Sequence, residues 1–294
     1  MLAHEIRGSG PGLVLLPGIG GTATGTWGNL LADLATEYTV VLPDFPGSGL
    51  SPLPSGPLRA DTVADQVVAT ARRAGLRSFV IGGTSLGATI AAKAAARHPD
   101  CVRGLFTLAG FARPRTTLWL SLEMWSALHS RADDKLSDFL ASLTFSDDYL
   151  AANTLQTARE ATARLVVATP GTARQIELAL HTDIRTDLPT ITVPTLVIAA
   201  TGDRLVGPAH SLELVDGIPG ARLAAVKGGH AATFEEPERT LEILKWFLRD
   251  LHRPPRTHDA TPPHRNGAGA DSRNPSPGPG LTPVIPAQRR PDEL

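Results

Sequence analysis

The segment Gly83-Thr84-Ser85-Leu86-Gly87 places the strongest constraint on the fold of this chain. It follows an apolar run, residues 79–82, and precedes an alanine-rich run, residues 88–97, with the composition of a helix. A serine with glycine two positions before and two positions after it is typical of a sharp turn between a strand and a helix. Such a turn presents the serine hydroxyl at the carboxyl edge of a sheet, where the helix N-terminus favours developing negative charge. We therefore expect Ser85 to act as a nucleophile.

Apolar runs alternate with helical segments along most of the chain. The predicted strands are residues 12–16, 38–42, 78–82, 102–109, 195–200 and 221–226. The predicted helices between and after them are residues 26–36, 61–74, 86–97, 208–217 and 237–251. This alternation predicts an α/β protein with a mainly parallel central sheet that helices cover on both faces. We expect residues 1–111 and 189–253 to form this core.

Residues 112–188 interrupt the alternation. They show no convincing strand pattern, but they contain amphipathic helical stretches at residues 118–129, 135–143, 157–167 and 172–181. Helices inserted between two core strands are most simply a cap, or lid, over the strand ends. We expect most of its aromatic residues to pack within the cap. The candidates for lining a substrate cavity are Trp125 and Tyr149, together with Phe111 just before the insertion.

The composition of the chain excludes several functional classes. A formal net charge of -1 argues against a surface for nucleic acid or anionic membrane. No apolar run approaches the roughly 18–20 residues that span a bilayer, and the N-terminus lacks the pattern of a secretory signal. The only cysteine, Cys101, excludes an internal disulfide and fits a reducing cytoplasm. We therefore expect a cytoplasmic protein whose oligomeric state is left open.

The last part of the chain has a different composition. Residues 254–294 are rich in Pro, Gly, Arg, Asn and Ser, and their few apolar residues show no period. Such a segment lacks the apolar surface that would offset the entropy of ordering it. We therefore expect a disordered tail there.

A serine nucleophile needs a base and an acid partner. The hydroxyl is a poor nucleophile at neutral pH unless an imidazole accepts its proton. Of nine histidines, His230 follows the predicted strand 221–226 in a glycine-containing loop that can place it over the sheet edge. The imidazole in turn needs a carboxylate to fix its tautomer. Asp203 follows the predicted strand 195–200 and is our candidate, whereas the other eight histidines are expected to be solvated or structural.

Acyl transfer also requires hydrogen-bond donors for the oxyanion that forms on the carbonyl. The backbone N–H of Leu86, directly after the nucleophile, is one candidate. The loop Leu16-Pro17-Gly18-Ile19-Gly20-Gly21 follows an earlier strand, and Ile19 is the candidate for the second N–H. This loop lacks the spacing of dinucleotide-binding and P-loop motifs, so it does not indicate a nucleotide site.

With these motifs, residues 12–251 resemble the α/β-hydrolase superfamily, specifically its lid-bearing serine esterases, lactonases and thioesterases. The order Ser85, Asp203, His230 is similar to the family's order of serine, acid and histidine. The segment from Asp44 to Ser51 also looks like the family's D-x-x-G-x-G-x-S loop. Two positions differ, because Pro17-Gly18 stands where members commonly carry His-Gly, and Thr84 stands where many carry His. We expect the oxyanion hole to persist with altered hydrogen bonding beneath it.

The expected activity is hydrolysis of a carboxylic ester, lactone or thioester through an acyl-enzyme on Ser85. We expect a small-molecule acyl substrate, no cofactor, no metal, and neither nucleic acid nor membrane as a partner. An acyltransferase or thioesterase of a biosynthetic pathway would use the same three residues. A non-catalytic ligand-binding protein on the same scaffold is the alternative from another class.

Overall fold

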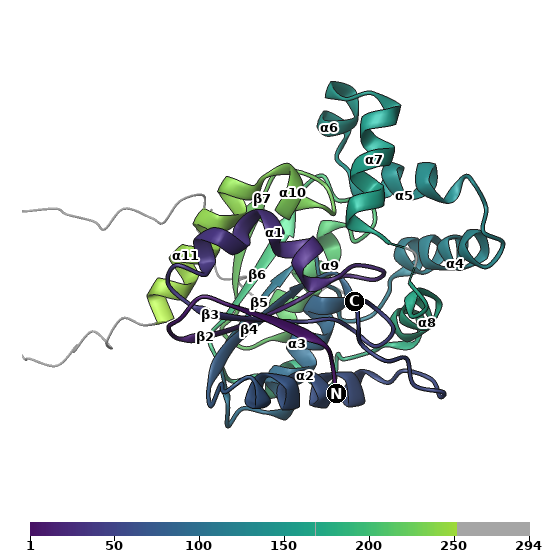
Figure 1. Ribbon diagram of the computed structural model, residues 1–294. Helices are drawn as coiled ribbons and strands as arrows, with labels where there is room; N and C mark the ends of the chain where they lie inside the picture. The colour runs from purple at the N-terminus through teal and green to yellow at the C-terminus, as the bar shows by residue number, and fades with distance from the viewer. Residues whose placement is uncertain (168, 252–294) are drawn as a thin grey trace, which may run out of the picture.

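The computed structural model describes residues 1–167 and 169–251, so the predicted tail lies outside the described residues. A seven-stranded sheet, in the order β1-β3-β2-β4-β5-β6-β7, forms its centre (Figure 1). The strands are β1 (His4–Arg7), β2 (Gly12–Leu16), β3 (Thr39–Pro43), β4 (Phe79–Thr84), β5 (Val102–Leu108), β6 (Thr195–Ala200) and β7 (Arg222–Val226). Only β1 is antiparallel to its neighbour. The prediction of a mainly parallel sheet is confirmed.

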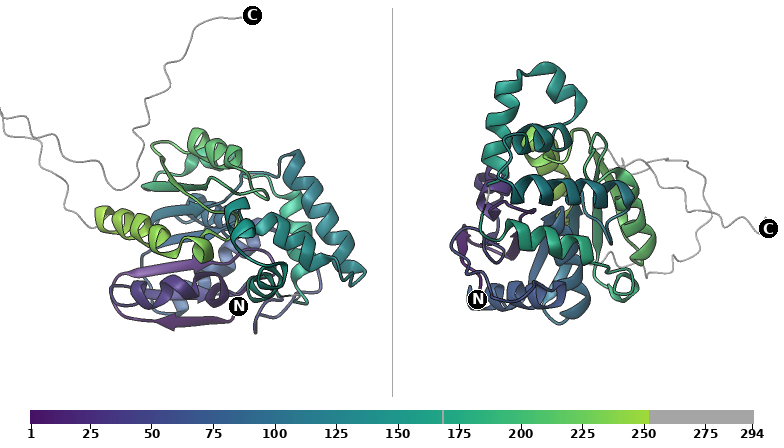
Figure 2. Two further views of the ribbon diagram at one scale, coloured as in Figure 1. Left: turned by 90° about the horizontal axis from the view of Figure 1, so that it is seen from above. Right: turned by 90° about the vertical axis from the view of Figure 1, so that its right-hand side faces the viewer.

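Helices cover both faces of this sheet, as the two views in Figure 2 show. The two apolar sides of each strand belong to different cores, because successive side chains of a strand point to opposite faces. Leu13 and Leu15 of β2 pack in the core beneath α1 (Ala23–Leu34) and α11 (Pro237–Leu251). Val14 and Leu16 pack in the core on the opposite face. The helices of that face are α2 (Ala60–Arg73), α3 (Leu86–Arg97) and α9 (Pro208–Gly217).

Further helices lie between β5 and β6. They are α4 (Thr116–Ser130), α5 (Leu136–Thr144), α6 (Asp147–Ala152), α7 (Leu155–Leu165) and α8 (Thr172–His181). Figure 1 shows them gathered at the right of the sheet rather than on its faces. The short helix η1 (Leu188–Thr190) leads back to β6, and α10 (Ala232–Glu235) lies between β7 and α11. The division of the chain into core, cap and tail stays a prediction.

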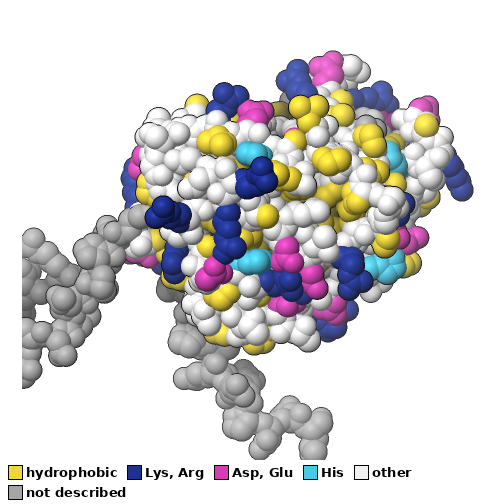
Figure 3. Space-filling model, turned by 60° about the horizontal axis from the view of Figure 1, so that its bottom comes forward, with side chains coloured by type: hydrophobic (Ala, Val, Ile, Leu, Met, Phe, Trp, Pro, Cys, Tyr) yellow, Lys and Arg dark blue, Asp and Glu magenta, His cyan; other side chains and the backbone are white. Residues whose placement is uncertain are grey.

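No helix within residues 1–167 and 169–251 is both long and apolar enough to cross a membrane. The face drawn in Figure 3 carries acidic and basic side chains interspersed with one another.

Candidate active site

Ser85 occupies a strained turn between β4 and α3. Its φ of 57° and ψ of −126° lie in a region that residues other than glycine rarely adopt. A Cβ on Gly83 would overlap the backbone of Gly87, and a Cβ on Gly87 would overlap the carbonyl oxygen of Pro17. Only glycine therefore fits at these two positions. The Ser85 N–H donates to the carbonyl oxygen of Leu108 at 3.1 Å, which ties the turn to β5.

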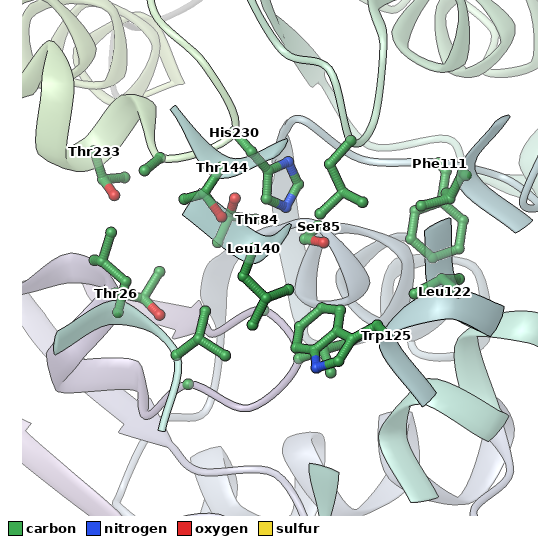
Figure 4. A pocket seen from close by; sticks show the side chains of 18 residues that line it. Thr26, Thr84, Ser85, Phe111, Leu122, Trp125, Leu140, Thr144, His230 and Thr233 are labelled. Atoms are coloured by element: carbon green, nitrogen blue, oxygen red, sulfur yellow. The ribbon is translucent and has the colours of Figure 1, made fainter. Parts of the chain in front are cut away.

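His230 and Asp203 form a hydrogen-bonded pair, in which the histidine is partly exposed and the aspartate is buried. The Nδ1 atom of His230 lies 2.8 Å from Oδ2 of Asp203, whose side chain is fully buried. The other carboxylate oxygen, Oδ1, accepts the N–H groups of Leu205 and Val206, each at 2.8 Å. Because both oxygens are engaged, Asp203 is held in one orientation. The second ring nitrogen of His230 is turned toward the Ser85 hydroxyl in Figure 4.

A mostly apolar cavity surrounds Ser85 and His230. Its empty volume is about 710 Å³, including its open mouth. Figure 4 shows Phe111 and Leu122 on one side of Ser85, and Thr26, Thr144 and Thr233 on the other. The apolar lining residues include Phe111, Leu118, Leu122, Trp125 and Leu140, and the lining threonines are Thr26, Thr84, Thr144 and Thr233. Among these lining residues of the described chain, His230 carries the one imidazole, and none carries a carboxylate, ammonium or guanidinium group.

The aromatic candidates for substrate contact separate into two environments. Phe111 and Trp125 line the cavity. Tyr149 does not lie with them and stacks on Phe145, with ring centroids 4.4 Å apart, and packs edge-on against Phe234. The interpretation of Tyr149 as a cavity residue is therefore corrected. Its position on the short helix α6 turns it toward a separate aromatic cluster.

The two candidate oxyanion donors flank Ser85. Ile19 lines the cavity, and Leu86 is the buried first residue of α3. Within residues 1–167 and 169–251, neither backbone N–H donates to a protein acceptor. The two residues after Ile19 do donate hydrogen bonds. The N–H of Gly20 donates to Oε1 of Gln175, and the N–H of Gly21 donates to the carbonyl oxygen of Gly18. Donors left free beside a nucleophile suit a carbonyl oxygen that gains charge.

The carboxylate of Glu235 holds the loop that carries His230, a role that the sequence pattern does not indicate. Glu235 accepts the N–H of Gly229 at 3.0 Å and the hydroxyl of Ser146 at 2.5 Å. Glu235 follows His230 closely in the sequence, but one of its partners, Ser146, lies 89 positions away in the chain. The structure thus anchors the loop to the residue that precedes α6.

A second histidine is buried but lies outside this cavity. The Nε2 atom of His210 accepts the N–H of Arg115 at 3.2 Å, and its Nδ1 faces the carbonyl oxygen of Gly207 at 3.2 Å. Burial lowers the pKa of His210 below its ordinary range, so the ring is neutral at pH 7. This agrees with a structural role.

Comparisons with known proteins agree with the fold. A family model described as the alpha/beta hydrolase fold matches residues 11–237. The chain is 33% identical over 250 residues to pyrrolizixenacetamide deacetylase of Xenorhabdus hominickii, covering 84% of this chain and 94% of that protein. It is 32% identical over 259 residues to pimeloyl-(acyl-carrier protein) methyl ester esterase of Stenotrophomonas maltophilia, covering 84% and 96%.

Solved structures share the architecture at lower identity. An enol-lactonase from Burkholderia xenovorans superposes with a TM-score of 0.74 at 24% identity, covering 84% of this chain and 96% of that one. A thermophilic esterase from Thermogutta terrifontis gives a TM-score of 0.73 at 24% identity, covering 86% and 94%. The chain therefore belongs to the α/β-hydrolase family. It is an enzyme of the hydrolase class.

Proposed function

We propose that the protein hydrolyses uncharged carboxylic esters, lactones or thioesters through an acyl-enzyme on Ser85. The observation that carries the proposal is the His230–Asp203 pair, whose free ring nitrogen faces a strained serine in an apolar cavity. Relatives named as a deacetylase and a methyl ester esterase support acyl transfer to water as the chemistry.

The first half of the proposed reaction forms the acyl-enzyme. The Ser85 oxygen bonds to the substrate carbonyl carbon while Nε2 of His230 takes the hydroxyl proton, and the carbonyl π-electron pair moves to oxygen. The N–H groups of Ile19 and Leu86 stabilise that oxyanion. When the tetrahedral species collapses, the bond to the leaving group breaks, and His230 passes its proton to the departing oxygen or sulfur.

Water completes the cycle at the same carbon. His230 takes a proton from water, the hydroxide adds to the acyl carbon, and the bond to Ser85 breaks as the serine oxygen regains its proton. Asp203 stays ionised throughout, orients the ring, and stabilises the imidazolium that forms twice.

The cavity lining supports an uncharged substrate with an apolar portion. A substrate carboxylate would lose its hydration there without gaining a charged partner among the lining residues, which costs free energy. Several of the apolar contacts, including Leu118, Trp125 and Leu140, come from the segment 112–188. We therefore propose that this segment is a cap that completes the site over a core of residues 1–111 and 189–253.

Replacing Ser85 by Ala tests the covalent mechanism. We expect Ser85→Ala to lower turnover of p-nitrophenyl acetate by at least ~10³-fold and to abolish labelling by a fluorophosphonate. Ser130→Ala, an exposed serine at the end of α4, is the matched control and should behave as wild type. Wild-type turnover by Ser85→Ala would refute the acyl-enzyme.

A further inference from the structure

The side chain of Gln175, on α8, is fully buried and makes hydrogen bonds to two separate loops. Its Oε1 accepts the N–H of Gly20 at 2.9 Å. Its Nε2 donates to the carbonyl oxygen of Pro46 at 3.1 Å and to the hydroxyl of Ser48 at 3.0 Å. Both amide hydrogens and one oxygen lone pair are thus engaged. A buried amide with this many partners fixes the groups that it joins.

The loop that carries Ile19 has few means of holding its own shape. Residues Pro17, Gly18, Gly20 and Gly21 offer no side-chain hydrogen-bonding group, and Ile19 is apolar. Gly20 has a φ of 71°, a conformation that glycine adopts at little cost. The peptide groups of this loop can therefore rotate unless other segments hold them.

Contacts from the inserted segment hold both polar groups of Gly20. Gln175 accepts its N–H, and the N–H of Val167 donates to its carbonyl oxygen at 3.0 Å. The position of Ile19 beside this clamped glycine limits the orientations that the Ile19 N–H can take.

The second loop keeps Gln175 itself in place. The N–H of Gly171, the N-cap of α8, donates to the carbonyl oxygen of Gly47 at 3.0 Å. A Cβ on either glycine would overlap the other's backbone, so α8 approaches the loop as closely as two chains can. With α8 fixed there, Gln175 reaches Gly20 from a rigid support.

We propose that Gln175 is a positioning residue for the oxyanion hole, acting through Gly20 on the N–H of Ile19. The helices between β5 and β6 would then hold one of the two oxyanion donors, the N–H of Ile19. Pro17 in the same loop has no side-chain hydrogen-bonding group that could do so. This inference rests on the proposed function of Ser85 and Ile19. Gln175 does not line the cavity and touches no reacting atom.

Gln175→Met tests the proposal, because methionine is similar in size and makes none of the three hydrogen bonds. We expect kcat to fall by about 10- to 100-fold with little change in KM, since a misplaced donor weakens only the transition state. The fall should be smaller than the ~10²–10³-fold loss that follows outright removal of a donor. Rates are divided by the concentration of active enzyme, which is measured by fluorophosphonate labelling carried to completion.

A comparison of an ester with its thionoester separates loss of the oxyanion hole from general destabilisation of the fold. Destabilisation should lower kcat/KM for both substrates equally and leave their ratio unchanged. Sulfur accepts hydrogen bonds more weakly than oxygen, so an intact hole favours the oxygen ester over its thiono analogue. We expect the oxygen-to-thiono ratio of kcat/KM to fall at least threefold in Gln175→Met. Ser48→Ala removes a single partner of Gln175, and it should shift the ratio in the same direction by less. This milder variant decides the matter if Gln175→Met does not fold.

Thr182→Val is the matched control, because it removes a buried hydroxyl just after α8 that bonds within the inserted segment, to Leu178. Its oxygen-to-thiono ratio should equal that of wild type. An unchanged ratio in both Gln175→Met and Ser48→Ala, or a rise in KM alone, would overturn the proposal. Failure of wild type to react with fluorophosphonate would instead count against the proposed function.

Discussion

Asp203 shows how much of a side chain's role is set by the atoms around it. One of its oxygens accepts two backbone N–H groups, and the other faces Nδ1 of His230. The two oxygens therefore have different tasks. Aspartate in a Gly-Asp pair is common in turns, and its sequence position alone does not reveal this arrangement.

Asp203→Asn should disable the site without disturbing the fold. The asparagine oxygen will keep the two N–H bonds of Leu205 and Val206, which leaves the amide NH₂ facing His230. The ring must then carry its proton on Nε2, where it cannot accept the serine proton. We expect kcat to fall by about 10⁴-fold, the cost known for this change in the serine-protease triad.

Steady-state kinetics and thermal unfolding check this prediction together. The exposed Asp216 on α9 offers the control Asp216→Asn, which should leave both unchanged. Activity of Asp203→Asn within tenfold of wild type would mean that His230 does not need the carboxylate.

At the scale of elements, local sequence patterns predicted most strands and helices of the core but missed some short elements. The bounds of β2, β6, α3, α8, α9 and α11 coincide with the predicted ranges. The sequence pattern did not indicate β1, because this short edge strand is mostly exposed and carries no apolar run. The helix α6 was missed as well, since its six residues are too few to show a period.

Replacing Gly171 and Gly28 by alanine should change the free energy of unfolding in opposite directions. Gly171 has an ordinary φ of −84°, so Gly171→Ala acts through steric overlap with the loop at Pro46 and not through backbone strain. We expect it to lower the free energy of unfolding by about 1–3 kcal/mol. Gly28 lies inside α1 with open space where a Cβ would go, so Gly28→Ala should raise it by about 0.5–1 kcal/mol.

Urea denaturation measures both variants under the same conditions. If Gly171→Ala is as stable as wild type, then α8 does not need its close approach to the loop. If Gly28→Ala is not stabilising, then the packing of α1 differs from that described.

At the scale of the whole molecule, two kinds of ionisable group make the stability depend on pH. Paired carboxyl groups act at low pH, and a buried histidine acts at a higher pH. Ion pairs such as Asp61 with Lys93 and Asp65 with Arg97 hold the pKa of each carboxyl below its usual range. Their contribution is lost only as the pH falls below the ordinary carboxyl value of 3.8. These pairs are partly exposed, so each contributes modestly.

His210 should make the protein lose stability at a higher pH than the carboxyls do. Burial, reinforced by Arg115, lowers the pKa of His210 from its ordinary 6.5, against the raising effects of its bond to Gly207 and of Glu213 and Asp203. The folded ring therefore stays neutral where the unfolded chain is protonated. The stabilisation is complete above pH 6.5 and declines as the pH falls below that value.

Unfolding measured from pH 8 to pH 4.5 tests this expectation. His210→Gln keeps an acceptor for Arg115 but cannot titrate, so its stability should fall less between pH 6.5 and pH 4.5. His181→Gln changes an exposed histidine and should follow wild type. Parallel curves for wild type and His210→Gln would show that another group causes the acid sensitivity.

The sequence alone determined the strand-turn-helix around Ser85, most of the parallel core, and the chain order of Ser85, Asp203 and His230. Those features depend on glycine spacing and on apolar periodicity, which are local properties. Only the tertiary structure decided that Phe111 and Trp125 share a cavity that Tyr149 does not reach. It also decided that Gln175 holds a loop 155 positions away in the chain. Contacts of this kind depend on how helices pack against loops, and no short stretch of sequence records that packing.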